Sequence, residues 1–185
     1  MKKIMFNDKY GLTQAVLEGR KTMTRRIVPQ SVVDYYTNEA EDPAMIDAAR
    51  FEVGEVVAIA QAYEELANDG YLKDMTVETD KGIGFDFKPE YRGAGWNNKM
   101  FVRADLMPHH IRITDIKVER LQDISREDMS KEGIVHDEAK DRFVCGDIVE
   151  FFQRDAFAAI IDKISGKGTW ARNPWVFCYE FELIK

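Results

Sequence analysis

The chain has 185 residues, of which 45% are hydrophobic, and its formal net charge is −7. This length and composition suit a single domain, residues 1–185, with one buried core. No apolar run reaches the roughly 18 residues of a membrane span and no signal peptide precedes the first strand, so a cytoplasmic protein is expected. Only Cys145 and Cys178 are present, outside any Cys-x-x-Cys pair, so no disulfide framework, metal site or cofactor is expected.

The beginning of the chain predicts a short strand followed by a short helix. Lys3–Phe6 has strand character, and residues 10–18 place apolar side chains at helical spacing. Gly19 lies where a left-handed cap would end that helix. The basic residues that follow therefore begin where a helix stops.

Two segments, residues 30–50 and 67–98, are expected to be surface insertions. The first is acidic and predicts about two turns of helix beginning at Pro43. The second predicts a hairpin around Asp80–Gly82, which is either a mobile flap or a long surface hairpin. Between them, residues 55–62 are almost continuously apolar, as in a strand buried on both faces.

The next elements are a strand and a short helix. Apolar residues predict the strand over 111–118. Ser125 and Asp128 have the spacing of a variant capping box, in which two side chains satisfy amides at a helix start. The helix that they begin is expected to end at Gly133.

The last part of the chain predicts a short strand, an amphipathic helix and a final strand. The short strand covers 143–148, and the helix covers 151–164, with Gly166 ending it. Residues 175–184 alternate in polarity, which predicts a half-buried strand with its aromatic side inward.

The predicted fold class is α+β, a small mixed β-barrel flanked by short helices. Several strands with two or three helices and no βαβ rhythm favour this class over a doubly wound sheet. The strands at 55–62 and 175–184 are expected in one sheet. The expected core is Val56, Val57, Ile59, Ile113, Val118, Phe177 and Phe181.

The segment Leu-Glu-Gly-Arg-Lys-Thr-Met-Thr-Arg-Arg, residues 17–26, resembles the signature of ASCH-domain proteins, a family related to the PUA RNA-binding domains. Residues 51–59 resemble the family's turn into a barrel strand. Residues 111–133 resemble the strand and short helix that follow in phage and prophage members, and residues 173–181 resemble the last strand. These segments are spread over the chain from end to end, and the resemblance implies a PUA-like barrel.

The basic segment predicts an anion-binding site. Residues 1–30 carry seven Lys or Arg against two acids, whereas residues 31–82 carry 13 acids against three bases. An acidic protein with one basic end suits a nucleotide or a local RNA feature, but not extended duplex DNA. Arg20 and Lys21 have an alternative explanation, because basic side chains also stabilise a helix C-terminus.

The predicted binding residues are Arg20, Lys21, Thr22, Arg25 and Arg26. The variant Arg25→Ala with Arg26→Ala is expected to weaken RNA or nucleotide binding and its salt dependence, with little change in stability.

The same segment contains candidate catalytic groups. Like charges around Lys21, together with partial burial, would lower its pKa and make it a usable base. Such a base could activate the hydroxyl of Thr24. In an ideal strand positions 21 and 24 face opposite sides, so they cooperate only where the chain turns. An ordinary charged turn entering a strand explains the same spacing.

Glu132 is the third candidate. It lies in the last turn of its helix, where the dipole opposes a carboxylate, and a cation such as Lys21 would offset this; a solvated surface glutamate is the alternative. In ASCH members that act as N4-acetylcytidine amidohydrolases, the catalytic group is the Lys and second Thr of Gly-x-Lys-Thr-x-Thr with a Glu of that helix. The resemblance thus implies Lys21, Thr24 and Glu132. The two insertions and the pair Arg25-Arg26 depart from those enzymes.

Three functions follow as hypotheses. The first is an ASCH-type, PUA-like domain that binds RNA or a nucleotide through residues 20–26. The second is an amidohydrolase that removes an acyl group from a modified nucleoside such as N4-acetylcytidine. The third, indicated by the acidic insertions, is a phage accessory protein that binds another protein. The sequence specifies no oligomeric state.

Overall fold

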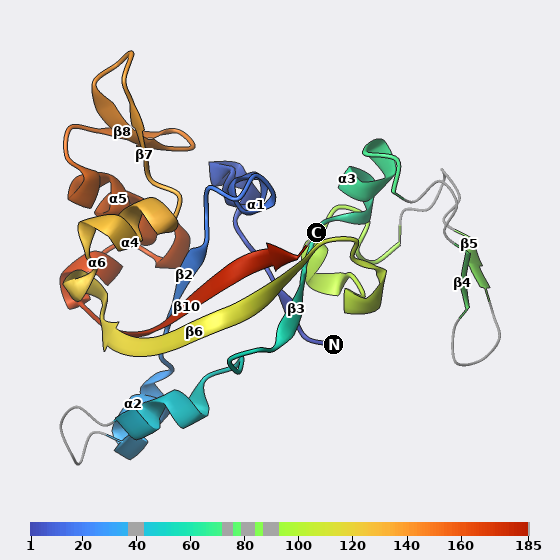
Figure 1. Ribbon diagram of the computed structural model, residues 1–185, viewed down its shortest axis with the longest axis horizontal. Coiled ribbons are helices and arrows are strands. Elements are labelled where there is room, and N and C mark those ends of the chain that lie inside the picture. The colour runs from blue at the N-terminus through green and yellow to red at the C-terminus, as the bar shows by residue number, and fades with distance from the viewer. Residues whose placement is uncertain (37–42, 72–75, 79–83, 87–92, 185) are drawn as a thin grey trace. The chain divides into compact units, whose positions relative to one another are not determined.

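The computed structural model describes residues 1–36, 43–71, 76–78, 84–86 and 93–184 (Figure 1). The chain divides into two compact units. The first unit comprises Met1–Phe6 and Val57–His110, and the second comprises Asn7–Val56 and Ile111–Lys185. The single-domain organisation stays a prediction.

The elements of the first unit begin with two short strands. They are β1 (Lys3–Ile4), β3 (Val56–Ile59, beginning one residue before the boundary), α3 (Tyr63–Asn68), β4 (Thr76–Glu78), β5 (Gly84–Asp86) and the 3-10 turns η3 (Lys99–Phe101) and η4 (Ala104–Leu106).

The second unit contains the longest strands and helices. Its elements are η1 (Asp8–Tyr10), α1 (Leu12–Leu17), β2 (Met23–Ile27), α2 (Gln30–Tyr36), η2 (Pro43–Ala48), β6 (His110–Arg120), η5 (Leu121–Asp123), α4 (Arg126–Lys131), β7 (Val135–Asp137), β8 (Arg142–Cys145), β9 (Ile148–Glu150), α5 (Gln153–Ser165), α6 (Thr169–Arg172) and β10 (Trp175–Ile184).

A five-stranded mixed sheet has the order β1-β3-β6-β10-β2. β1 runs parallel to β3, and β10 runs antiparallel to β2. The α+β class is therefore confirmed, and the strands predicted at 55–62 and 175–184 do belong to one sheet. The terminal strands β1 and β2 are not paired with one another in the described ranges, so no closed barrel is detected.

The centre of the sheet is more deeply buried than the sequence predicts. Residues 176–179 of β10 are all buried, although the alternating pattern predicts a strand with one exposed face. The reason is that β10 lies between β6 and β2 and both of its faces are covered. Five of the seven expected core residues are buried to 4% exposure or less, whereas Val56 and Val118 are half-buried.

The predicted helix end and helix start near the basic segment are confirmed. Gly19 has φ +74°, the left-handed conformation that ends α1. Ser125 is the N-cap of α4, and its hydroxyl accepts a hydrogen bond from the Asp128 amide at 3.0 Å. The helix α2 was missed, and none of its seven residues is buried. The helix predicted from Pro43 is a 3-10 helix instead.

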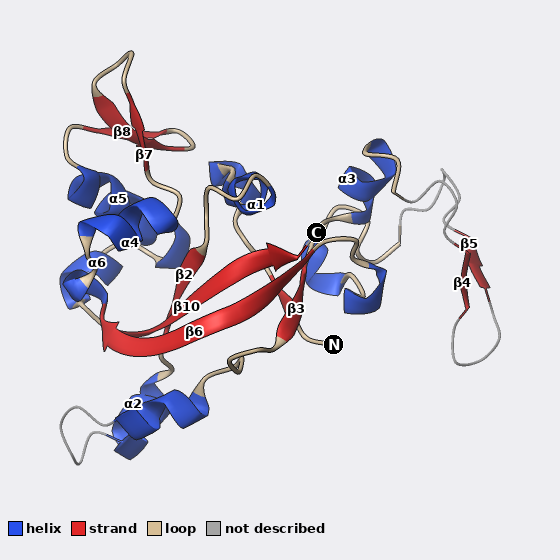
Figure 2. Cartoon of the chain, viewed as in Figure 1, coloured by secondary structure: helices blue, strands red, loops and turns tan. Residues whose placement is uncertain are grey.

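A second, three-stranded sheet is formed by β7, β8 and β9 in chain order (Figure 2). The predicted strand over 143–148 is the hairpin of β8 and β9, which turns at Gly146. The helix α5, predicted over 151–164, contacts this sheet as well as α4 and α6. This packing holds α4 in place, and α4 carries part of the candidate site.

In the first unit, the predicted hairpin is present as β4 and β5. They pair antiparallel, with Val77 opposite Phe85. The connecting residues 79–83 lie outside the described part of the chain, so the flap and surface-hairpin interpretations both stay predictions.

Candidate functional site

Lys21 lies between the end of α1 and the start of β2, where the chain turns. The amides of Arg20 and Lys21 both donate to the carbonyl of Ala15, at 2.8 and 2.9 Å, and the next amide donates to the carbonyl of Lys131 at 2.9 Å. These bonds direct the Lys21 side chain inward, where it is only 2% exposed. Its ammonium donates to Glu132 twice, to Oε2 at 2.6 Å and to the backbone carbonyl at 2.8 Å.

Glu132 is the C-cap of α4, and its carboxylate also binds Arg25 of β2. Arg25 Nη1 donates to Glu132 Oε1 at 3.1 Å and contacts the sulfur of Met23 at 3.2 Å. Nη2 donates to Glu119 at 2.6 Å and to Asp128 at 2.8 Å, and Nε donates to Glu119 at 3.0 Å. A guanidinium has five N–H donors, so all of them are occupied within the protein.

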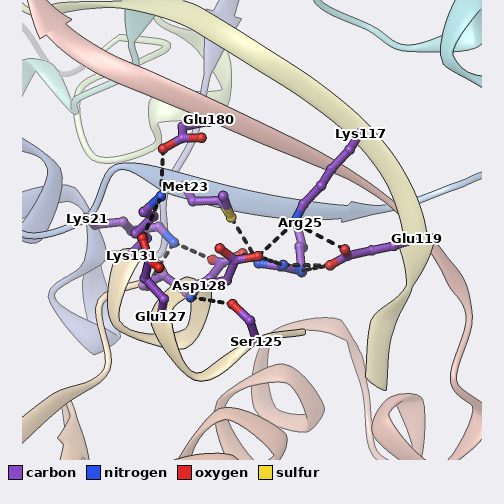
Figure 3. A network of polar contacts seen from close by, with 11 residues as sticks. Lys21, Met23, Arg25, Lys117, Glu119, Ser125, Glu127, Asp128, Lys131 and Glu180 are labelled. Carbon is purple, nitrogen blue, oxygen red and sulfur yellow. Dashed lines mark hydrogen bonds and ion pairs between the residues drawn. The ribbon is translucent and has the colours of Figure 1, made fainter. Parts of the chain in front are cut away.

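The network reaches the surface through Lys117. This residue of β6 binds Asp128 at 2.8 Å and Glu119 at 3.2 Å, and its side chain is 42% exposed. Figure 3 shows Lys117 and Glu119 of β6 reaching towards the same point as Arg25 of β2. Three cations thus face three carboxylates, Glu119, Asp128 and Glu132, and the formal charges balance.

Burial changes the protonation equilibria in this network. It lowers the pKa of Lys21, and the attraction of Glu132 opposes that shift without reversing it. The sequence predicts the same direction, but burial contributes more than the neighbouring cation Arg26 does. For Glu119 and Asp128, burial works against the charged form, but bonds from Arg25 and Lys117 outweigh it and lower the pKa of both carboxyls.

Two cysteines lie near the network but stay protonated at neutral pH. Cys178 lies opposite Arg25 in the β10–β2 pairing. Cys145 is close enough to Lys21 for the positive charge of the lysine to interact with the thiol. Burial raises the pKa of both thiols. Neither is therefore a ready thiolate nucleophile.

Thr24 lies on the face of β2 opposite to Arg25. Thr24 pairs with Tyr179, while the next residue, Arg25, pairs with Cys178. Successive side chains of a strand point to opposite faces, so Thr24 faces away from the Arg25 network. It is 5% exposed, and within the described residues no hydrogen bond joins its hydroxyl to Lys21 or Glu132.

Most of the predicted anion-binding cations bind carboxylates of the protein itself. Arg20 binds Glu18 at 2.5 Å on the surface, and Lys21 and Arg25 belong to the buried network. Thr22 is held by its backbone, which accepts from the Phe181 amide at 2.9 Å. Arg26 is half-buried on the Thr24 face; burial lowers its pKa, Glu132 opposes that shift, and Arg50 adds to it.

The sequence analysis missed Lys117 and Glu119 as members of the site, and it assigned Asp128 only to capping. One signal was available for α4, because Asp128 and Glu132 are four residues apart and share a helix face. Across the described part of the chain, no group of three His, Cys, Asp or Glu could hold a metal ion, and no helix is long and apolar enough to cross a membrane.

Comparison with protein-family models finds no match, and comparison with curated proteins finds none. Two chains of solved structures match. One is the crystal structure of protein EF3133 from Enterococcus faecalis V583, described as family-model DUF984, with 14% sequence identity and a TM-score of 0.44. The match covers 100% of this chain and 80% of that chain. A similarity at this level carries no argument about function, so family and activity stay proposals.

Proposed function

We propose that this chain is an ASCH-type, PUA-like domain that hydrolyses the acyl amide of a modified nucleoside of the N4-acetylcytidine class. One observation carries the proposal. The resemblance pairs Lys21 and Glu132 as catalytic residues. They are 111 residues apart in the chain, and Lys21 Nζ lies 2.6 Å from Glu132 Oε2.

The chemistry requires a base that is neutral for part of the time. Burial lowers the pKa of Lys21, which increases the fraction of neutral amine near neutral pH. Because Thr24 faces away from Arg25, the attacking oxygen is assigned to water. Lys21 removes a proton from this water as its oxygen bonds to the acetyl carbonyl carbon. The bond from that carbon to N4 then breaks, the Lys21 proton passes to N4, and cytidine and acetate are released.

Glu132 acts on the lysine in this scheme. Its carboxylate accepts from the ammonium that Lys21 becomes, so it stabilises the charged intermediate and fixes the direction of the Nζ lone pair. Arg25 holds the other carboxylate oxygen at 3.1 Å. Since all five Arg25 donors are occupied, the oxyanion must be stabilised by backbone amides or by other side chains.

The test is the release of acetate from N4-acetylcytidine by the purified protein. Lys21→Met is expected to abolish turnover and Glu132→Gln to reduce it severely, whereas the surface variant Arg20→Ala retains it. If the unaltered protein leaves N4-acetylcytidine and related acylated nucleosides intact, the enzymatic function is rejected.

A second candidate function is binding of RNA or a nucleotide without hydrolysis. The observation that favours it is Arg26, which is half-buried and close enough to Arg50 for the two positive charges to interact. A phosphate bound beside both guanidinium groups would interact with two positive charges. Arg26→Ala should then weaken nucleotide binding and flatten its salt dependence. Both functions are consistent with a cytoplasmic protein.

A further inference from the structure

A cavity of about 420 Å³ lies in the second unit between α4, β8 and the first turn of α5. Its most buried lining residues are Ile124 and Met129, which are 4% and 2% exposed. Two aromatic rings, Phe143 and Phe152, also line it. A cavity of this size with apolar lining is in the range of small-ligand sites.

The rim of the cavity carries two guanidinium groups and one carboxylate. Arg126 and Arg154 are exposed lining residues, and Asp155 is the acid. Arg154 is held in place, because its Nη2 donates to the Gln122 carbonyl at 2.7 Å and its guanidinium lies 4.8 Å from the centre of the Trp170 ring. In a protein of net charge −7, this cavity thus has a local excess of positive charge.

One aromatic ring of the cavity is unusually open to solvent. Phe152 is 69% exposed although it borders the cavity, and its neighbour Phe151 is 65% exposed without lining it. An accessible ring beside arginines is the composition that binds single-stranded RNA, because every base can stack on an aromatic face and arginine contacts the phosphate. An apolar peptide would use the rings but not the two cations.

The helix α4 connects this cavity to the Lys21–Glu132 pair. Arg126 and Met129 of α4 line the cavity, while Asp128 and Glu132 bind Arg25 in the buried network. The helix has only six residues, about 9 Å of length, so the two sites are close neighbours. A single-stranded RNA with one nucleotide in the cavity would place its adjoining nucleotides beside α4.

We infer that this cavity binds one base of a single-stranded RNA, stacked on Phe152, with Arg126 and Arg154 contacting the adjoining phosphates. The substrate is then an acylated cytidine within an RNA strand and not the free nucleoside. This inference rests on the proposed function for its substrate, but the RNA contact is measurable without turnover.

The experiment measures the binding of a short fluorescent single-stranded RNA to the full chain by anisotropy. Stacking on one ring contributes enough that Phe152→Ala should weaken binding about fivefold or more. Phe151→Ala is the matched control, because it removes an equally exposed ring that does not line the cavity, and it should change the dissociation constant less than about twofold. Arg126→Ala should reduce the slope of log affinity against log salt by about 0.7.

Equal RNA binding by the Phe152→Ala and Phe151→Ala variants would overturn the inference. A lack of RNA binding by the unaltered chain would also overturn it, and would favour a protein as the partner of the two rings. A comparison of substrates separates the two proposals. Faster hydrolysis of an acylated oligonucleotide than of N4-acetylcytidine, lost in Phe152→Ala, supports the inference. Equal hydrolysis of both substrates overturns it and leaves the proposed function intact. RNA binding through Phe152 without any hydrolysis supports the cavity and rejects the enzyme.

Discussion

Arg25 and Asp128 are joined by a charged hydrogen bond of 2.8 Å that ties β2 to α4. With Glu119 and Glu132 also bound to Arg25, this guanidinium is the point where strands β2 and β6 and helix α4 meet. The Arg25 side chain is only 1% exposed, so water could not easily take its place as a partner of the three carboxylates. Loss of Arg25 alone would leave these carboxylates without their cation, and this revises the expectation that Arg25→Ala with Arg26→Ala would leave stability nearly unchanged.

Arg25→Met should lower the free energy of unfolding by about 3–5 kcal/mol, because it leaves buried carboxylates without their cation. Urea denaturation measures the change. Arg20→Ala is the matched control, since its ion pair with Glu18 is about half exposed and should contribute no more than about 1 kcal/mol. If Arg25→Met does not fold, Asp128→Asn should still fold and should lose part of the free energy of unfolding. Equal stability of Arg25→Met and Arg20→Ala would contradict a structural role for the network.

Stability should fall in acid because of Glu119 and Asp128. Their pKa values are lower in the folded state than the ordinary 4.5 and 3.8, so the unfolded chain binds more protons than the folded chain as the pH drops. The stabilisation is complete above these ordinary values and is lost as the pH falls through the lowered pKa values. Urea midpoints between pH 7 and pH 3 measure it, and Asp128→Asn should flatten the profile. An unchanged profile in that variant would exclude Asp128 as a source.

The geometry also predicts which oxygen attacks the substrate. Because Thr24 faces away from the network, Thr24→Val should retain much of the activity that Lys21→Met loses, and no acetylated Thr24 peptide should be found by mass spectrometry during turnover. Activity should rise with pH through the lowered pKa of Lys21, since the neutral amine is the base. An acetylated Thr24, or inactivity of Thr24→Val with an intact fold, would assign the nucleophile to threonine.

Gly146→Ala should destabilise the protein more than Gly19→Ala does. Both glycines have positive φ, +59° and +74°, so both substitutions strain the backbone. A Cβ at Gly146 would in addition lie 2.7 Å from the Cα of Tyr10, whereas nothing lies within 4 Å of one at Gly19. Comparison of the two unfolding midpoints isolates the contact between the β8–β9 hairpin and the segment before α1. Equal losses would show that the hairpin can shift away from Tyr10.

The elements that the sequence predicts well are those specified by local chemistry. Gly19 at the end of α1, Ser125 at the start of α4 and the periodicity of α5 each act within a few residues, so a single sequence is enough to find them. The burial of β10 on both faces depends on what covers the sheet, and alternation along one strand does not contain that information.

The candidate site was only half predictable for a related reason. Lys21 and Glu132 were identified through the resemblance, but the pairing of Arg25 with three carboxylates was not, because its partners lie 94 to 107 residues away. Four cations in one short segment look like a binding surface when each is considered alone. Three of them, Arg20, Lys21 and Arg25, bind carboxylates of the chain itself.

The same separation orders events on the ribosome. Lys21 and Arg25 are synthesised long before the carboxylates that bind them, which follow 94 to 111 residues later. At typical elongation rates this gap lasts on the order of 5–20 s. During that time the emerging chain carries its basic segment in water, next to ribosomal RNA, without the counterions of the finished protein. The second unit therefore closes around its cations only after α4 has been made, so β2 cannot take its final place by co-translational folding of the N-terminal segment alone.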